Sequence, residues 1–85
     1  MNEITIDCAG LETPRMFHQA LAEGLAFPAW YGHNLDALHD LLTAIADETR
    51  LTLLNFEGLG PFSRGFRRVL TDAEGENPRL TIIFR

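Results

Sequence analysis

Three short runs of apolar and β-branched residues alternate along this chain with segments in which apolar residues recur every three or four positions. The strand-like runs span residues 3–7, 50–56 and 80–84, and the helical segments span residues 14–24, 35–45 and 61–74. Strands that are separated by helices need crossover connections, which produce a parallel sheet with helices packed on it. The sequence therefore predicts an α/β fold, a three-stranded parallel sheet covered by three main helices, in a single domain over residues 1–85.

Capping residues mark the starts of two of these helices. Thr13 precedes Pro14, and a threonine hydroxyl can accept hydrogen bonds from the free amides of a first turn in which proline is well tolerated. Asn34 is a natural cap for the second helix, with Asp36 in a first turn that favours negative charge. The segment 27–32 (FPAWYG) contains a proline and is expected to form a loop. The second helix is expected to bury Leu35, Leu38, Leu42 and Ile45. Residues 75–78 (GENP) are expected to form a turn before the last strand.

Length and composition narrow the class of protein. A chain of 85 residues with 46% hydrophobic content is globular, but it is too small to enclose a large cofactor cavity. The single cysteine, Cys8, has no partner for a disulfide, which favours a reducing cytoplasm. There is no apolar run long enough for a membrane span, and the first residues lack the features of a signal peptide. We expect a cytoplasmic protein that binds neither membrane nor cofactor.

Charge is distributed unevenly along the chain. Its seven basic residues are all arginines, against twelve acids, for a formal net charge of −5. No arginine or lysine occurs between Met16 and Thr49, a stretch that contains several acids. Such a surface repels phosphate backbones and attracts basic proteins, so a basic protein partner is favoured and direct nucleic-acid binding is not expected. A solvated acidic face that only aids solubility is the plainer interpretation.

The second helix carries two acids, Asp36 and Asp40, one turn apart. Like charges at this spacing destabilise an isolated helix by roughly 0.2–0.5 kcal/mol, and no nearby basic residue in the sequence offsets the repulsion. The pair follows Trp30 and Tyr31, which offer rigid contact area, and Gly32, where a partner backbone can approach closely. Aromatic residues beside charges are typical of binding hot spots, although both aromatics could equally fold onto the core.

The run from Phe27 to Asp40 (FPAWYGHNLDALHD) resembles the signature of the barstar family. That signature has a proline, an aromatic pair, a glycine and a variable residue, followed by Asn-Leu-Asp-Ala-Leu, another variable residue and Asp. The resemblance extends to most of the chain, since residues 80–84 (LTIIF) look like the last strand of the family. The barstar fold, a three-stranded parallel sheet with helices, agrees with the order of elements predicted above.

The resemblance implies an inhibitor of a barnase-type, guanyl-specific ribonuclease, in the manner of an immunity protein or antitoxin. In such a complex Asp40 would take the place of a substrate phosphate and Asp36 would pair with a second basic residue. The ring of Trp30, where the family has a tyrosine, would pack over the catalytic groups of the enzyme. The candidate partner-binding residues are Trp30, Gly32, Asn34, Leu35, Asp36, His39, Asp40, Thr43, Asp72 and Glu76.

The sequence also departs from the family pattern. His39 stands where many members carry an aromatic residue, Ile45 stands where a tryptophan is found, and the connection over residues 56–62 is shorter than in the founding protein, which has an extra helix there. These changes leave the acidic pair intact but bear on the identity of the partner. The alternative is a barstar-fold interaction module that binds another basic toxin nuclease or a regulatory protein.

Enzymatic and metal-binding functions are less well supported. His39 lies three residues after Asp36 and could share a metal with it, with His33 as a third ligand, but no paired metal-binding motif occurs. An exposed helix face gives Asp36 and Asp40 no pocket for acid–base catalysis. Cys8 is expected to be an inert apolar residue. We therefore expect no catalytic residue, no metal and a monomeric free chain, with His18 on the surface.

Overall fold

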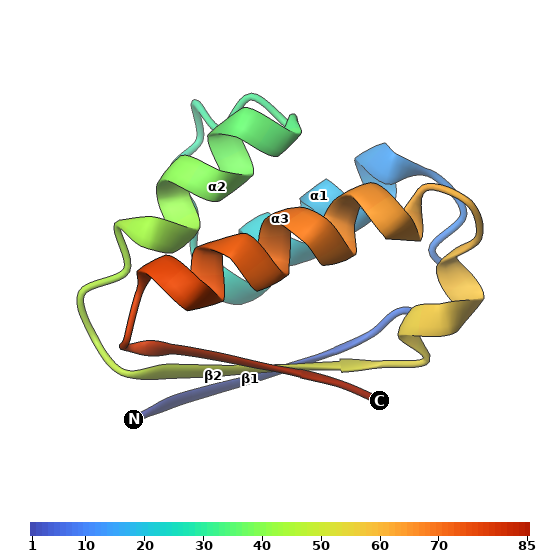
Figure 1. Ribbon diagram of the computed structural model, residues 1–85. Helices are drawn as coiled ribbons and strands as arrows, with labels where there is room; N and C mark the ends of the chain where they lie inside the picture. Colours follow the sequence, from blue (N-terminus) through green and yellow to red (C-terminus); the bar gives the residue numbers. More distant parts are fainter.

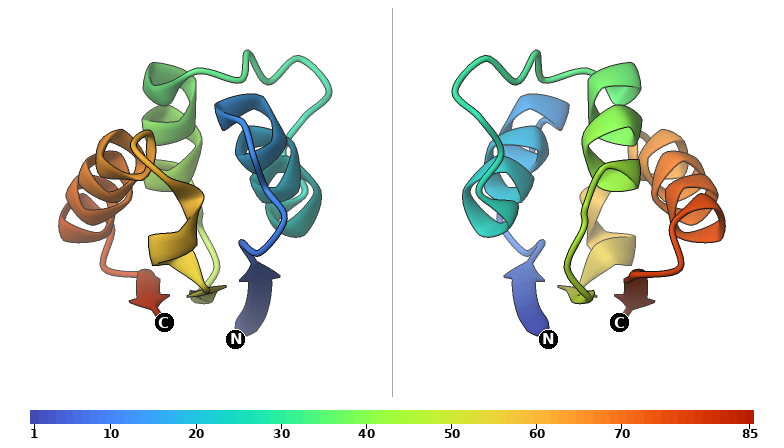
Figure 2. Two further views of the ribbon diagram at one scale, coloured as in Figure 1. Left: turned by 90° about the vertical axis from the view of Figure 1, so that its right-hand side faces the viewer. Right: turned by 90° about the vertical axis from the view of Figure 1, so that its left-hand side faces the viewer.

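The computed structural model describes residues 1–85, and its three helices lie on the same side of one sheet (Figures 1 and 2). The strands run parallel in the order β1-β2-β3, so β2 is central. The elements in chain order are β1 (Asn2–Asp7), α1 (Pro14–Leu25), α2 (Leu35–Thr43), β2 (Thr49–Leu54), the 3-10 helix η1 (Phe56–Leu59), α3 (Ser63–Glu76) and β3 (Leu80–Phe84). The predicted fold class, a three-stranded parallel sheet with three main helices, is confirmed.

The sheet contributes one row of apolar side chains to the core. Leu51 of β2 is opposite Ile4 of β1 on one side and Ile82 of β3 on the other. Leu51 and Leu53 are fully buried, whereas the residues that alternate with them along β2, namely Arg50, Thr52 and Leu54, are only partly buried. This alternation shows that one face of the strands packs under the helices while the other faces away from them.

The helices meet over this row. The ring of Phe17 on α1 packs edge-on against Phe66 of α3, with centroids 4.5 Å apart, and against Phe56 of η1, with centroids 6.1 Å apart. Leu38 and Leu42 bury α2 in the same cluster. Each such side chain contributes about 1.5–3 kcal/mol through its removal from water, so these contacts fix the position of α2 on the domain.

The predicted caps are present. The hydroxyl of Thr13 accepts a hydrogen bond from the amide of Met16 at 3.2 Å, with Pro14 opening α1. Asn34 caps α2 in the same way, accepting from the amide of Ala37 at 2.8 Å. None of the helices combines the length and the hydropathy that a membrane span requires.

Several boundaries differ from the sequence expectation. The second helix ends at Thr43 instead of residue 45, so Ile45 lies after it and is only partly buried, and the third helix begins at Ser63 instead of residue 61. The second strand ends at Leu54 instead of continuing to residue 56, because Asn55 adopts a left-handed conformation (φ 57°) that asparagine tolerates. The chain then turns into η1, which occupies part of the shortened connection. The third helix runs to Glu76 and includes Gly75, which the sequence had suggested lay in the turn.

The prediction that His18 lies on the surface is wrong. Its side chain is buried beside Phe17 and Leu21, with 4% of the residue exposed. The ring fits in the interior because its Nδ1 atom lies 2.5 Å from the hydroxyl of Tyr31, a polar partner supplied by the loop after α1. A buried polar group that is hydrogen-bonded avoids most of the desolvation penalty.

Candidate functional site

The candidate residues are gathered on α2, the loop before it and the second half of α3. Asp36 and Asp40 of α2, with Asp72 and Glu76 of α3, are exposed, and we call the surface that they form the acidic face. No candidate residue is buried: His39 and Thr43 are partly exposed, and the exposed ones are Trp30, Gly32, Asn34, Leu35, Asp36, Asp40, Asp72 and Glu76.

Helix α2 exposes its acidic side chains to solvent because the leucines on its opposite face pack into the core. Leu38 and Leu42 are fully buried, as the helical spacing predicted. Leu35 was expected in the same buried stripe but remains 37% exposed, since it opens the helix at the edge of the core. A Cβ atom at Gly65 would lie 3.4 Å from a methyl carbon of Leu35, so Leu35 rests against α3.

The carboxylates of the acidic face have no arginine partner. The arginine ion pairs of the structure are Arg50 with Glu3 and Arg67 with Glu57, and no arginine nitrogen lies within 4.0 Å of Asp36, Asp40, Asp72 or Glu76. The side chain of Asp40 is 85% exposed. No arginine of the chain therefore neutralises this surface, and a cationic partner can reach its carboxylates.

The loop before α2 separates its two neighbouring aromatics. Trp30 is 75% exposed, whereas Tyr31 is only 4% exposed and packs against Phe27, with ring centroids 5.0 Å apart. The amide of Tyr31 donates to the carbonyl of Pro28 at 3.0 Å, and the Nδ1–H of His33 donates to the carbonyl of Tyr31 at 3.0 Å. Tyr31 thus anchors the loop, and Trp30 stands free beside it.

Gly32 makes room for the cap of α2. A Cβ atom at this position would lie 2.9 Å from the side-chain nitrogen of Asn34, closer than real Cβ contacts. The same nitrogen is 3.4 Å from the carbonyl oxygen of Gly32, to which it donates. A side chain at Gly32 would therefore displace the residue that caps the acidic helix.

His39 joins the two helices of the acidic face. Its Nε2–H donates to Oε2 of Glu76 at 2.6 Å, and its Nδ1 lies 3.9 Å from Oδ1 of Asp40. The pKa of His39 is raised, first by the hydrogen bond that it donates to Glu76 and then by the negative charges of Glu76, Asp40 and Asp72, with partial desolvation opposing them. In the free protein Glu76 is therefore already engaged by His39, a contact that no local pattern in the sequence indicates.

The hydroxyl of Thr43 is turned back onto its own helix. It donates to the carbonyl of His39 at 2.9 Å and lies 3.1 Å from that of Asp40. Only the lone pairs of this hydroxyl remain free, so Thr43 can accept a hydrogen bond from a partner but not easily donate one.

Asn77 positions the acidic helix and was missed by the sequence reasoning, which placed it in a turn. It is buried, and its side-chain nitrogen donates to the carbonyls of Leu42 and Ile45, each at 3.0 Å. Its side-chain oxygen accepts from the amide of Arg79 at 3.0 Å. Asn77 thereby ties the end of α2 to the end of α3. An asparagine before a proline is common in turns, so sequence alone carried no signal for this role.

The structure offers little for catalysis or metal binding. No three His, Cys, Asp or Glu side chains gather closely enough to hold a metal ion. Cys8 is buried, and burial, assisted by the charge of Asp7, raises its pKa to about 11, so it is a protonated thiol near neutral pH. A thiol in this state is a poor nucleophile.

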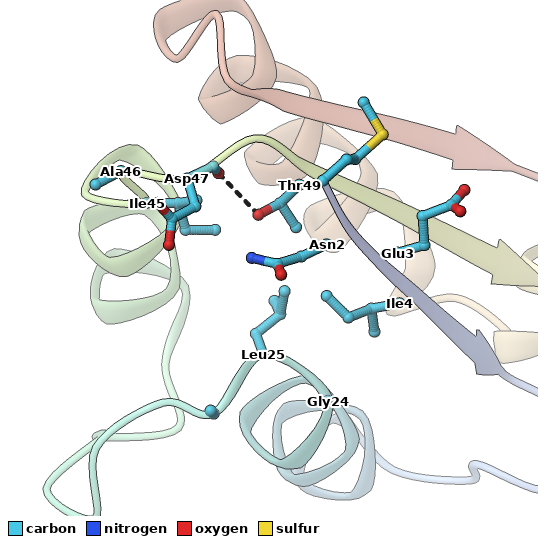
Figure 3. A pocket seen from close by; sticks show the side chains of 11 residues that line it. Asn2, Glu3, Ile4, Gly24, Leu25, Ile45, Ala46, Asp47 and Thr49 are labelled. Atoms are coloured by element: carbon cyan, nitrogen blue, oxygen red, sulfur yellow. Dashed lines mark hydrogen bonds between the residues drawn. The ribbon is translucent and has the colours of Figure 1, made fainter.

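The largest hollow lies away from the acidic face, between the end of α1, the start of β1 and the segment after α2 (Figure 3). It measures about 570 Å³ and is open to solvent. Figure 3 shows Leu25, Ile45 and Ile4 beside the amide of Asn2, and Thr49 hydrogen-bonded to the backbone of Asp47. The hollow is thus lined by aliphatic side chains and by a few polar groups, and it contains no candidate residue of the acidic face.

Comparisons with known proteins agree with this arrangement. A family model described as "Barstar (barnase inhibitor)" matches residues 1–85. The chain is 38% identical over 81 residues to the "Putative ribonuclease inhibitor YrdF" of Bacillus subtilis (strain 168), and the aligned part covers 89% of each protein. The family model therefore covers the whole chain, and the similarity to the relative covers most of it.

Proposed function

Because the chain belongs to the barstar family, we propose that it inhibits a ribonuclease of the barnase type by placing the acidic face and the loop before α2 in the active site of the enzyme. The name of the Bacillus subtilis relative, a ribonuclease inhibitor, supports the proposal. The chain acts as a binding protein and not as an enzyme, and the cytoplasm suits its lone buried Cys8.

One observation carries the proposal. Asp36 and Asp40 are exposed on the same helix, and no arginine of the chain pairs with either. Two unpaired carboxylates one turn apart repel each other, so the arrangement is mildly unfavourable for the free helix. Binding to a cationic surface would reverse this, since each carboxylate would then gain a partner.

The chemistry of inhibition is phosphate mimicry. Ribonucleases concentrate positive charge to bind the RNA backbone and to stabilise the charge that develops in the transition state. Carboxylates that are held in place in advance compete for the same groups with little loss of conformational freedom. Leu38 and Leu42 fix α2 on the core, which supplies that rigidity to Asp36 and Asp40.

Trp30 extends the contact beyond the charges. Its ring is exposed on a loop that Tyr31 anchors to the interior, so an aromatic surface stands ready without a conformational change. Exposed tryptophans at the edge of a charged surface are typical of binding hot spots. We assign to Trp30 the packing over the catalytic groups of the enzyme, and to Asp40 the place of the substrate phosphate.

The test is inhibition of RNA cleavage by barnase, comparing the native chain with Asp40→Asn. The matched control is Asp47→Asn, which makes the same change of charge at an exposed aspartate beyond the end of α2. We expect Asp40→Asn to weaken inhibition by about 2–5 kcal/mol, the general range for breaking a buried charge pair at an interface, to which charge pairs of the barnase–barstar complex themselves contribute. Asp47→Asn should leave inhibition nearly unchanged.

Other outcomes point elsewhere. Equal and strong inhibition by the native chain and Asp40→Asn would remove the acidic face from the mechanism. Equal and weak binding by both would favour the alternative, a barstar-fold module that recognises a different basic toxin nuclease or a regulatory protein.

A further inference from the structure

The acidic face contains one group that can change its charge near neutral pH. His39 lies on α2, which also carries Asp36 and Asp40. The facing helix α3 carries Asp72 and Glu76. The two ring nitrogens of His39 point to Glu76 (2.6 Å) and Asp40 (3.9 Å). No arginine lies within 4.0 Å of these four carboxylates, and His39 is the one basic side chain within that distance of two of them, Asp40 and Glu76.

The surroundings of His39 favour its protonated form in the free protein. Glu76 accepts a hydrogen bond from one ring nitrogen and the carboxylate of Asp40 lies 3.9 Å from the other, and the pKa is raised by Glu76 first and then by Asp40 and Asp72. A histidine starts from a pKa of 6.5, so even a modest rise brings its titration into the physiological range. Part of the acidic face is thus neutralised by a proton that the solution can supply or remove.

Building on the proposed function, we infer that the cationic partner and a proton on His39 compete for Glu76 and Asp40, so that binding of the partner releases this proton. A partner cation that reaches either carboxylate withdraws the negative charge that holds the imidazolium, and it also places a second positive charge beside it. The charged ring then becomes unfavourable and loses its proton to solvent.

Binding of the partner then depends on pH. At high pH His39 is neutral, and the carboxylates of the face are free to attract the partner. As the pH falls through the pKa of free His39, the proton must be displaced first, and affinity drops by up to about tenfold per pH unit. The chain would therefore bind its enzyme most tightly on the alkaline side of neutrality and release it more easily as the surroundings become acidic.

The experiment measures the proton directly. Calorimetric titration with barnase in buffers of different ionisation enthalpy counts the protons released on binding, and NMR follows the His39 ring in the free and bound chain. The same titrations are made with His39→Gln, which keeps a hydrogen-bond donor near Glu76 but cannot titrate. Because barnase contributes the same groups in both series, only the difference between the two chains is used.

We expect the native chain to release more protons than His39→Gln between about pH 6 and 8, and its affinity to change more steeply with pH. Glu76→Gln should shift the titration of His39 toward lower pH in the free chain, whereas Glu12→Gln, a control at an exposed glutamate before α1, should leave it in place. Equal proton release by the native chain and His39→Gln would overturn the inference while leaving ribonuclease inhibition intact.

Failure of the proposed function has a different signature. If barnase does not bind at any pH, a synthetic hexa-arginine peptide replaces it as the cationic probe, and NMR again follows His39. A lowered pKa of His39 on addition of the peptide would support the competition between cation and proton. An unchanged titration in the presence of the peptide, at concentrations where Asp40 and Glu76 signals move, would overturn it.

Discussion

The hydroxyl of Tyr31 lies 2.5 Å from Nδ1 of His18 in the interior of the protein. The residue before Tyr31, Trp30, is 75% exposed. Burial lowers the pKa of His18, with a further contribution from His33, and burial raises the pKa of Tyr31 to about 12. Both groups are therefore neutral near pH 7, and a single hydrogen bond joins α1 to the loop. The presentation of Trp30 depends on this core contact.

Tyr31→Phe should lower the free energy of unfolding by about 1–3 kcal/mol, because it leaves the ring nitrogen of buried His18 without its partner. Urea denaturation at pH 7 measures the effect. Trp30→Ala serves as the neighbouring control, since an exposed side chain changes stability by about 0.5 kcal/mol or less. Equal losses in the two variants would show that the loop is not anchored through Tyr31.

Stability should fall on mild acidification because of His18. Its pKa in the folded chain lies below the ordinary value of 6.5. As the pH drops below about 6.5, the unfolded chain binds a proton that the folded chain accepts only at lower pH, so the free energy of unfolding decreases through this window. His18→Gln removes the titrating group, and urea denaturation at several pH values should show a flatter acid limb than in the native chain.

His39 gives the opposite sign and is the internal control. Its folded pKa is raised, so its contribution to stability is present below about pH 6.5 and is lost as the pH rises through the raised value. His39→Gln should therefore remove a loss of stability that the native chain shows as the pH rises above about 6.5, and it should leave the slope below pH 6.5 unchanged. The same change of slope in both histidine variants would contradict the environments that the structure gives them.

The sequence predicted the elements that depend on local chemistry. The caps at Thr13 and Asn34 and the short apolar run that forms the central strand β2 follow from patterns over a few positions. The acidic pair on α2 was also predicted and is exposed. The expectation that this pair binds a partner came from the resemblance to the family motif. The two acids alone would not have indicated it, because acid pairs are common on helix surfaces.

The features that escaped prediction depend on residues that are far apart along the chain. His18 directly follows the apolar residue Phe17 on α1. Its burial is tolerable because the hydroxyl of Tyr31, thirteen positions away, is its hydrogen-bond partner. Similarly, His39 and Glu76 are separated by 37 positions and meet only because α2 packs on α3. Neither contact leaves a periodic or local signal in the sequence.

Gly75→Ala should stabilise the chain by about 0.5–1 kcal/mol. Gly75 lies in α3 with no atom within 4 Å of an added Cβ, so alanine reduces the freedom of the unfolded chain without a clash. Gly24→Ala is the contrasting change in α1, where the Cβ would approach Ile4 to 3.1 Å and Ile6 to 3.4 Å. We expect thermal denaturation to show a higher melting temperature for Gly75→Ala and a smaller increase or a decrease for Gly24→Ala. The reverse order would be inconsistent with the packing of α1 on β1.

Asn77 should matter through its amide group more than through its size. Asn77→Ala removes one hydrogen bond to Leu42 of α2, one to Ile45 just after that helix and one from the amide of Arg79, and should lower the free energy of unfolding by about 1–3 kcal/mol. Asn77→Asp keeps the shape and the acceptor but directs a carboxylate oxygen at the carbonyls of Leu42 and Ile45, so it should be more destabilising at pH 7 and partly recover when acid protonates it.

Hydrogen exchange locates this effect. Because Asn77 holds the C-terminal end of α2, its variants should speed amide exchange in α2 more than in β2, whose bonds to β1 and β3 are untouched. Asn2→Ala, at an exposed asparagine with no side-chain hydrogen bond, is the control. If Asn77→Asp were as stable as the native chain, the clamp on the acidic helix would have to lie elsewhere, and the rigidity that phosphate mimicry requires of α2 would rest on Leu38 and Leu42 alone.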